Sequence, residues 1–228
     1  AVRYTGRTLV SSDGSVAFDW VGTYLETRFT GGKLSVKVSE TGTSYYNVFV
    51  DGKLHKVVKV CGTDTLIHLV SGIDKRIHSL KIQKRSEGEF GKTTVHQFVL
   101  SGSGRLAEEL AVRTRHIEFI GNSLTCGYGT DGKHRDEPFL VETENCNLTF
   151  ASMVARYYDA DYTLIAHSGR GAARNYGDSV RVSKVTMKDR MLNTFDEDLT
   201  HKWNFKEYRP DLVVINVGSN DFSTEPHP

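Results

Sequence analysis

The sequence predicts two consecutive units: an antiparallel β-sandwich over residues 1–110 and an α/β domain with a parallel sheet over residues 111–228. In the first half, short alternating apolar runs follow one another with frequent turns and no helical period, which is typical of a sandwich. In the second half, apolar runs alternate with loops and a helix-period segment, as in α/β domains. At 228 residues the chain is long enough for two modest domains.

The first half contains clear strand and hairpin signals. Residues 33–39 alternate strictly and place Leu34, Val36 and Val38 on one face. The pair Asp51-Gly52 separates two alternating runs, which predicts a hairpin with a type I′ turn. Further strands are expected at residues 24–30, 65–70, 76–84 and 94–100. Together these signals favour an antiparallel sandwich.

The pattern changes after residues 105–110, where we expect a linker or a short helical turn. Residues 149–158 predict a helix, because large apolar side chains recur there at helical spacing and should pack on the sheet. Those side chains are Phe150, Met153, Val154, Tyr157 and Tyr158. Residues 212–217 are apolar almost throughout, which predicts a central parallel strand covered on both faces.

Composition excludes several functional classes. The net charge of +1, with both signs mixed, provides no long-range field for nucleic acid or an anionic membrane. The longest apolar runs are too short to span a bilayer. Because three cysteines are an odd number, at least one is free or pairs outside the chain. Cys126 and Cys146 could form a disulfide, and three reduced thiols are equally consistent with the sequence.

Three short motifs directly follow apolar runs, and they carry the chemistry. They are Gly121-Asn122-Ser123, Ser168-Gly169-Arg170-Gly171 and Gly218-Ser219-Asn220-Asp221. Taken singly, each is typical of a turn or a helix cap. The carboxyl ends of parallel strands lie at one rim of a sheet, where ligands bind. The three motifs together therefore deliver a hydroxyl nucleophile, a backbone N–H and a side-chain amide, the components of an acyl-transfer site.

The order of these motifs resembles the SGNH (GDSL-like) hydrolases and, more closely, carbohydrate esterase family 2. The nucleophile block at residues 117–129 is similar to that family. So are Ser168-Gly169-Arg170-Gly171 with Arg174-Asn175-Tyr176-Gly177, and Trp203-Asn204-Phe205 leading into residues 210–216. The resemblance implies a jelly-roll domain over residues 1–110 and a flavodoxin-like SGNH domain over residues 111–228.

The resemblance also implies an activity and roles for individual residues. Ser123 would be the nucleophile, and its own N–H, the Gly169 N–H and the Asn220 amide would form the oxyanion hole. Tyr128, Tyr176 and Trp203 would offer stacking surfaces for sugar. The protein would be a secreted or periplasmic serine esterase that removes O-acetyl groups from plant cell-wall polysaccharides through an acetyl-serine intermediate, with no metal or organic cofactor.

The sequence departs from the family pattern in two places. Asn122 stands where the superfamily has aspartate, but this position transfers no proton, so activity should survive. The family's base is a histidine near the C-terminus, and no matching block follows Asn220, since His227 has the wrong place and spacing. We therefore expect the SGNH domain to be incomplete after its third strand. A further C-terminal segment should supply the histidine.

Other motifs in the chain carry less weight. Asp131 and His134 have Asp-x-x-His spacing, but they lie in a Gly-rich loop that is more typical of a solvated turn. The pattern G-x-G-x-x-G over residues 127–132 starts too far from the strand end for dinucleotide binding. The scattered histidines show no metal-ligand spacing. They are His55, His68, His78 and His96.

The expected partner is an acetylated oligo- or polysaccharide, with neither nucleic acid nor membrane involved. The main rival hypothesis is a carbohydrate-binding protein that holds sugar in the same cleft without turnover, and a third is a sandwich module with a degenerate partner domain. A covalent serine probe distinguishes them, because labelling at Ser123 favours the esterase. The sequence does not identify the sugar or the acetylated hydroxyl.

Overall fold

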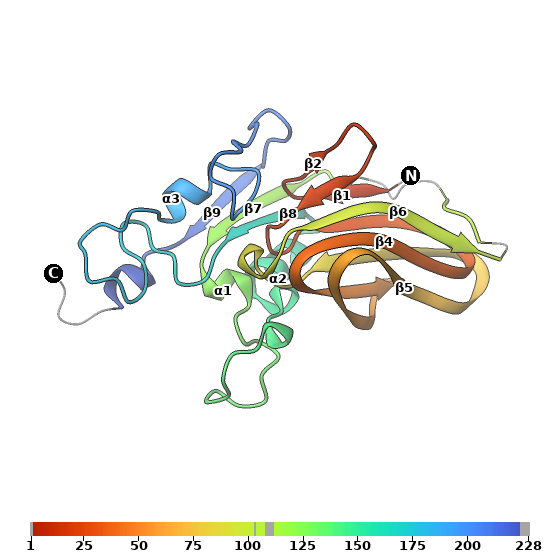
Figure 1. Cartoon of the computed structure of the whole chain (residues 1–228), viewed down its shortest axis with the longest axis horizontal. Helices are drawn as coiled ribbons and strands as arrows, with labels where there is room; N and C mark the ends of the chain where they lie inside the picture. The colour runs from red at the N-terminus through yellow and green to blue at the C-terminus, as the bar shows by residue number, and fades with distance from the viewer. Residues whose placement is uncertain (1, 103, 108–111, 224–228) are drawn as a thin grey trace.

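Two sheets of opposite kind lie side by side along the long axis of the molecule (Figure 1). The computed structural model describes residues 2–102, 104–107 and 112–223. The first sheet has six strands, all paired antiparallel; five follow the order β1-β4-β6-β3-β2, and β5 pairs with β4 outside this path. Its strands are β1 (Arg3–Thr5), β2 (Leu9–Val10), β3 (Val16–Phe18), β4 (Tyr24–Val50), β5 (Lys53–Lys84) and β6 (Thr93–Ser101).

The two long strands β4 and β5 contain most of the short strands that the sequence predicts. They bend, so that residues 24–30 of β4 pair with residues 77–83 of β5, while residues 43–50 pair with residues 53–61. The expected hairpin is confirmed: Asp51 and Gly52 both have positive φ, at 49° and 74°, as a type I′ turn requires. Leu34, Val36 and Val38 are buried together in the core of this sheet, as their alternation predicts.

The second sheet is parallel and has three strands in the described part of the chain. They are β7 (His116–Gly121), β8 (Asp161–Ala166) and β9 (Leu212–Asn216), in the order β8-β7-β9. The prediction that residues 212–217 form a central, covered strand is wrong. β7 takes the centre because it pairs with both neighbours, whereas Leu212 and Ile215 of β9 are 52% and 64% exposed. No described element covers these side chains, which explains the exposure.

The helical segments are short. They comprise α1 (Ser123–Cys126), α2 (Phe150–Tyr157) and α3 (Met187–Arg190), and the 3-10 turns η1 (Gly88–Phe90), η2 (Val141–Thr143), η3 (Cys146–Leu148) and η4 (Ser219–Phe222). The expected helix at residues 149–158 is confirmed by α2, but its expected buried face is wrong. Ala151, Ser152 and Ala155 are buried, while Tyr157 is 83% exposed. Small side chains let the helix approach the core closely, so most of the large residues are turned outward, although Phe150 still lies edge-on against Phe119 with ring centroids 6.0 Å apart.

Several residues of the first unit are buried in the core of the second. Trp20 is fully buried and packs with Ile120, Ile165 and Met187. Tyr24 lies against Tyr162 with ring centroids 5.2 Å apart, and its hydroxyl donates to Asp161 at 2.7 Å. The two units therefore share a core. The linker expected at residues 105–110 falls partly outside the described residues, since residues 108–111 are not among them.

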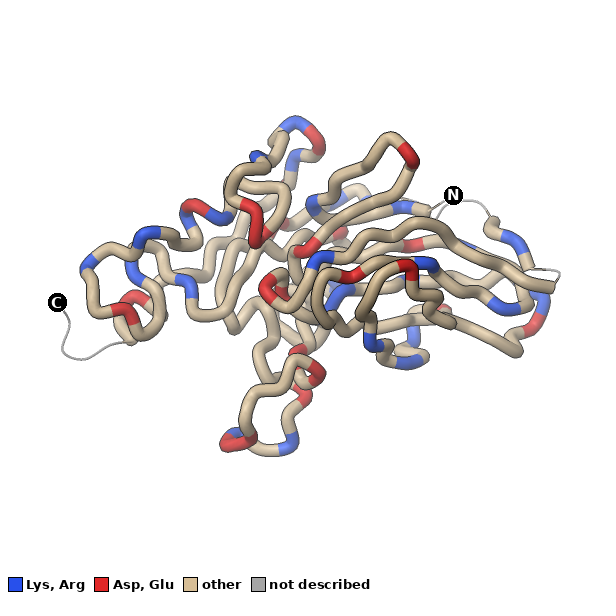
Figure 2. Tube along the Cα trace, viewed as in Figure 1, with Lys and Arg blue, Asp and Glu red and all other residues tan. Residues whose placement is uncertain are grey.

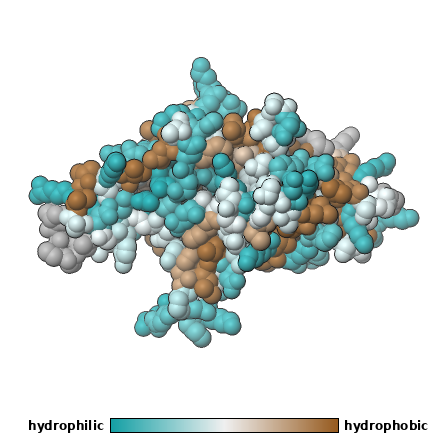
Figure 3. Space-filling model, in the orientation of Figure 1, coloured by the Kyte–Doolittle hydropathy of each residue, from teal (hydrophilic) through white to brown (hydrophobic). Residues whose placement is uncertain are grey.

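The surface has no dominant charge or apolar belt on the face shown. Basic and acidic residues are interspersed along the trace (Figure 2). Hydrophobic side chains form separate areas among hydrophilic ones (Figure 3). Among the helices that the structure describes, none is long and apolar enough to cross a membrane. All three cysteines are free thiols, so a disulfide between Cys126 and Cys146 is not formed.

We predict that Trp20→Ala lowers the free energy of unfolding by about 3–5 kcal/mol, because it removes a fully buried ring from the core shared by the two units. Chemical denaturation followed by fluorescence or circular dichroism measures the change. Tyr157→Ala is the matched control, because that ring is largely exposed and its loss should change stability by no more than about 0.5 kcal/mol. Equal effects of the two substitutions would contradict the shared core.

Candidate active site

The three motifs that follow β7, β8 and β9 meet at one pocket of about 460 Å³. The parallel register aligns the strand ends, because Gly121 of β7 is opposite Ala166 of β8 and Asn216 of β9. The pocket is lined by Glu89, Ser123, Tyr128, Ser168, Gly169, Tyr176 and Asn220. The structure thus brings Ser123, Gly169 and Asn220 to one place.

Ser123 is the first residue of α1, and Asn122 sets its position. The Asn122 side chain caps the helix by accepting the Leu124 N–H at 3.2 Å. Its amide also donates to Ser219 Oγ at 3.0 Å, which ties the nucleophile turn to the loop after β9. A side chain at Gly121 would come within 2.0 Å of Thr125 Oγ1, so this tight turn requires glycine. Within the described residues, neither the N–H nor the hydroxyl of Ser123 has a hydrogen-bond partner.

Gly169 follows β8 with a left-handed backbone, at φ 74°. A Cβ at this position would meet only Tyr176 at 3.8 Å, so the backbone conformation rather than space favours glycine. The Gly169 carbonyl accepts the Tyr176 N–H at 2.8 Å. The Gly169 N–H finds no acceptor in the part of the chain that the structure describes. It is therefore a free donor in a residue that lines the pocket.

Asn220 lies in η4, after β9, and is nearly buried. Its amide donates one hydrogen bond to the Arg170 carbonyl at 2.9 Å. An amide carries two N–H groups, so a second donor remains for a ligand. The bond to Arg170 fixes the side chain against the loop that carries Gly169.

Asp221, the next residue, joins the last two loops. Its carboxylate accepts the backbone N–H groups of Ala172, Ala173 and Arg174 at 2.8, 2.7 and 2.9 Å. Partial burial alone would raise the pKa of Asp221, but these backbone donors lower it below its ordinary value. The charged carboxylate is therefore a structural link between η4 and the loop that leads to Tyr176.

The expected stacking residues separate into two places. Tyr128 and Tyr176 line the pocket with Ser123, and both rings are exposed. Tyr128 stacks on Phe139 with centroids 3.8 Å apart. Trp203 lines different clefts, together with Tyr208, and the guanidinium of Arg7 lies 5.4 Å from its ring centroid. It is not among the residues that line the Ser123 pocket.

Asp131 and His134 do not form a pair. The Asp131 carboxylate forms an ion pair with Arg85 and accepts the Asn145 amide at 3.0 Å, so it anchors the loop. His134 is exposed in that loop and does not line the Ser123 pocket. His227 lies outside the described residues.

Two residues at the site were not anticipated from the sequence. His167 is buried at the end of β8, with Nδ1 2.7 Å from Asp196 Oδ2 and Nε2 3.7 Å from a Glu89 oxygen. Burial alone would lower the pKa of His167, but the hydrogen bond and the charge of Asp196 raise it above the ordinary value. His167 directly precedes the Ser168-Gly169 motif, and this neighbouring position could have marked it as a site residue in the sequence. Glu89 belongs to the other unit, and no local pattern marks it.

In the described part of the chain, three clusters contain groups that could bind a metal, and all use residues near this site. They are Glu87 with Glu89 and His167, Glu87 with Cys126 and Glu144, and His167 with Asp196 and Glu197. Several of their donor atoms are engaged in contacts within the protein, since Glu87 binds Ser168 and Arg190 pairs with both Asp196 and Glu197. The chemistry of the pocket is that of hydrogen-bond donors around a serine, which suits an acyl group.

Comparisons with known proteins agree with this geometry. Residues 4–109 match the family described as carbohydrate esterase 2 N-terminal, and residues 117–227 match the GDSL-like lipase/acylhydrolase family. A solved family two carbohydrate esterase from Clostridium thermocellum, in complex with cellohexaose, is 34% identical with a TM-score of 0.92. The match covers 99% of this chain and 68% of that one.

Curated relatives give the same picture. The cellulase/esterase CelE of Acetivibrio thermocellus is 34% identical over 223 residues, which cover 98% of this chain and 27% of that protein. An acetylxylan esterase / glucomannan deacetylase of Cellvibrio japonicus is 33% identical, with 96% of this chain and 61% of the relative covered. The chain thus spans only part of the length of these proteins.

We predict that Asp221→Asn disturbs the backbone amides of residues 172–174, because a neutral amide oxygen cannot accept all three N–H groups. The lowered pKa of Asp221 gives the pH dependence: the stabilisation is fully present above about pH 4 and is lost as the pH falls through the folded-state pKa. NMR spectra of the three amides should show the same displacement in Asp221→Asn at pH 7 as in the wild type on acidification. If neither Asp221→Asn nor acidification moves these amide signals, Asp221 is not the link between the two loops.

Proposed function

The chain belongs to carbohydrate esterase family 2, and from this premise we propose that it is a serine esterase that removes O-acetyl groups from plant cell-wall polysaccharides. The observation that carries the proposal is the meeting of Ser123, Gly169 and Asn220 at one pocket. A hydroxyl surrounded by N–H donors without internal partners suits an acyl carbonyl whose oxygen becomes negative in the transition state.

The proposed reaction uses these groups in two steps. Ser123 Oγ attacks the acetyl carbonyl carbon, a base accepts the hydroxyl proton, and the oxyanion accepts hydrogen bonds from the N–H groups of Ser123 and Gly169 and from the Asn220 amide. The sugar oxygen then leaves with the proton that the base returns to it, and the acetyl group stays on Ser123. Water attacks this acetyl ester through the same oxyanion hole and gives a proton to the base, which passes it to Ser123 Oγ as acetate is released.

The general base is the component that the described residues near Ser123 do not supply. His167 is buried, and its two ring nitrogens face Asp196 and Glu89. We therefore propose that the base is a histidine from a segment beyond these 228 residues. That segment would also cover the exposed apolar side chains of β9 and complete the SGNH domain. In this proposal residues 1–110 form the jelly-roll domain and residues 111–228 form the SGNH part.

The pocket rim supports a sugar substrate. Tyr128 and Tyr176 present exposed aromatic rings on which a pyranose can stack, and the Glu89 carboxylate can accept hydrogen bonds from sugar hydroxyls. The names of the relatives include acetylxylan esterase and glucomannan deacetylase, and one related structure holds cellohexaose. We take acetylated plant-wall polymers as the substrate class, with action outside the cell or in the periplasm.

A second function is favoured by one specific observation. The exposed tyrosines border a pocket in which Ser123 has no basic partner among the described residues, so the cleft could hold sugar without turning it over. A fluorophosphonate probe separates the two functions. Labelling of Ser123 that is lost in Ser123→Ala supports the esterase. Sugar binding without labelling, in a form that includes the proposed base, supports the binding protein.

We predict that Asn220→Ala lowers kcat by about 10²–10³ with little change in KM, because its free N–H acts mainly on the charge that develops in the transition state. Steady-state kinetics on an acetylated sugar, with a form of the protein that turns it over, measure both constants. Asn204→Ala is the matched control, because Asn204 is exposed and lies outside the Ser123 pocket. An unchanged kcat would reduce Asn220 to a capping residue.

We also predict that residues 1–228 alone deacetylate sugars poorly, and that a form extended past Pro228 recovers turnover. The reason is that a serine hydroxyl without a base is a weak nucleophile. Changing the added histidine to alanine should remove the activity again. Strong activity of residues 1–228 that His134→Ala abolishes would overturn this proposal, because it would make the Asp131 and His134 loop the source of the base.

A further inference from the structure

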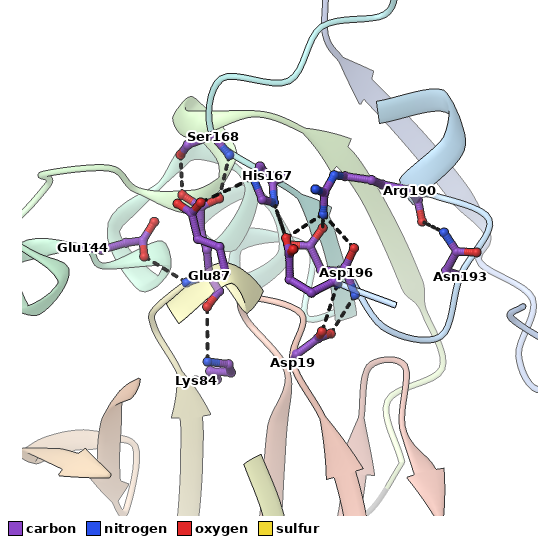
Figure 4. Close-up of polar contacts among 11 residues, drawn as sticks. Asp19, Lys84, Glu87, Glu144, His167, Ser168, Arg190, Asn193 and Asp196 are labelled. Atoms are coloured by element: carbon purple, nitrogen blue, oxygen red, sulfur yellow. Dashed lines mark hydrogen bonds and ion pairs between the residues drawn. The ribbon is translucent and has the colours of Figure 1, made fainter. Parts of the chain in front are cut away.

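The 3-10 turn η1 carries residues of the first unit into the second unit, beside the proposed oxyanion hole. Glu87, which caps this turn, is fully buried. Its carboxylate accepts the Ser168 backbone N–H at 2.5 Å and also the Ser168 hydroxyl (Figure 4). A single side chain from the first unit thus holds both polar groups of one residue in the loop after β8.

Ser168 directly precedes Gly169, so these two bonds act next to the proposed oxyanion donor. The Gly169 N–H belongs to the peptide that joins it to Ser168, and Gly169 itself has a left-handed backbone with the wide freedom of glycine. Fixing Ser168 through its N–H and its hydroxyl limits the rotations that would turn the following peptide away from the pocket. The Glu87 carboxylate therefore restricts the orientation of the Gly169 N–H.

The same carboxylate also reaches the helix that begins at the nucleophile. Cys126 is the last residue of α1, and its Sγ lies within 4.8 Å of carboxylate oxygens of Glu87 and Glu144. The thiol is fully buried, and burial together with the nearby Glu87 raises its pKa well above the ordinary value. Cys126 is thus a neutral thiol that can donate to Glu87. Glu87 thus hydrogen-bonds to the loop of Gly169 and lies close to the helix that begins at Ser123.

Glu87 lies among other buried polar side chains that hold its backbone in place. Glu144 is buried, and burial and the neighbouring Glu87 raise its pKa to about 11, so it is a neutral acid at pH 7. Its Oε2 accepts the Glu87 backbone N–H at 2.9 Å. The buried Lys84 ammonium lies 3.4 Å from the Glu87 carbonyl oxygen, and His167 and Glu89 face the carboxylate from the pocket side. The two donors of Ser168 therefore satisfy the Glu87 side chain, while Glu144 and Lys84 satisfy its backbone N–H and carbonyl.

We propose that Glu87 is a positioning residue for acyl transfer, which holds the Gly169 loop and the Ser123 helix in register and makes the first unit part of the catalytic apparatus. This inference rests on the proposed esterase function. A carboxylate that only stabilised the contact between units would not need to hold both polar groups of the residue before an oxyanion donor. Misplacement of a catalytic group by about 1 Å can cost on the order of 10²-fold in rate.

The first test is kinetic and uses a form of the protein that turns over acetylated sugar. Glu87→Ala should lower kcat by about 10–100-fold and change KM by less than about threefold, because substrate binding at the tyrosine rim is not altered. Glu87→Gln should recover most of the loss, since its amide can exchange hydrogen bonds with both Ser168 groups. Glu142→Ala is the matched control at an exposed glutamate. A wild-type kcat in Glu87→Ala, or a loss confined to KM, overturns the proposal.

The second test needs no turnover and so separates this proposal from the esterase function. Hydrogen exchange measured by mass spectrometry should show faster exchange in residues 166–171 and 123–128 of Glu87→Ala than in the wild type, at a temperature where both are folded. Ser168→Ala removes only one bond to Glu87 and tests the loop if Glu87→Ala does not fold. Unchanged exchange in both segments overturns the proposal, whereas the absence of labelling at Ser123 in a form that includes the proposed base overturns the esterase function.

Discussion

The parallel pairing of β7 with both β8 and β9 is the constraint on which the rest of the site depends. Gly121 is aligned with Ala166 on one side and with Asn216 on the other, so all three strands end at the same level. The loops that follow must then begin at one edge of the sheet, whatever their length. Cross-links between these loops, such as Asn122 to Ser219 and Asn220 to Arg170, complete the arrangement locally. The sheet therefore brings the three loops to one edge, and the side-chain amides of Asn122 and Asn220 fix the loops relative to one another.

Polar groups dominate one part of the contact between the two units, although a shared apolar core lies close by. Asp19 accepts the backbone N–H groups of Asp196 and Glu197, while Asp196 accepts hydrogen bonds from Arg190 and contacts His167 (Figure 4). Isolated buried charges are costly, so each of these groups has a partner of opposite charge or a backbone donor. Such a network has few geometrically acceptable alternatives, whereas apolar side chains can repack in many ways. It therefore fixes how the first unit sits against the end of β8.

Local signals predicted local structure well, and contacts across the two units could not be predicted. The Asp51-Gly52 turn and the alternation at Leu34 depend on neighbouring residues and are confirmed. The face of α2 was predicted wrongly, because helical spacing marks the large residues, whereas close packing selects Ala151 and Ala155. The convergence of Ser123, Gly169 and Asn220 followed from strand ends alone. The contact of Glu87 with Ser168 joins residues 81 positions apart, and no periodicity encodes it.

After α1, residues 127–145 form a long loop, here called the excursion, that projects away from both sheets (Figure 1). It is closed at its base by hydrogen bonds from the Asp131 N–H to the Thr143 carbonyl at 2.9 Å and from the Asn145 N–H to the Gly127 carbonyl at 3.0 Å. Arg85 reinforces this closure by pairing with Asp131. The outer part of the excursion still reaches the Ser123 pocket, because Phe139 stacks on Tyr128. Insertions and deletions at its tip can therefore accumulate during divergence and change the wall of this pocket, while the strand ends that carry Ser123, Gly169 and Asn220 keep their places.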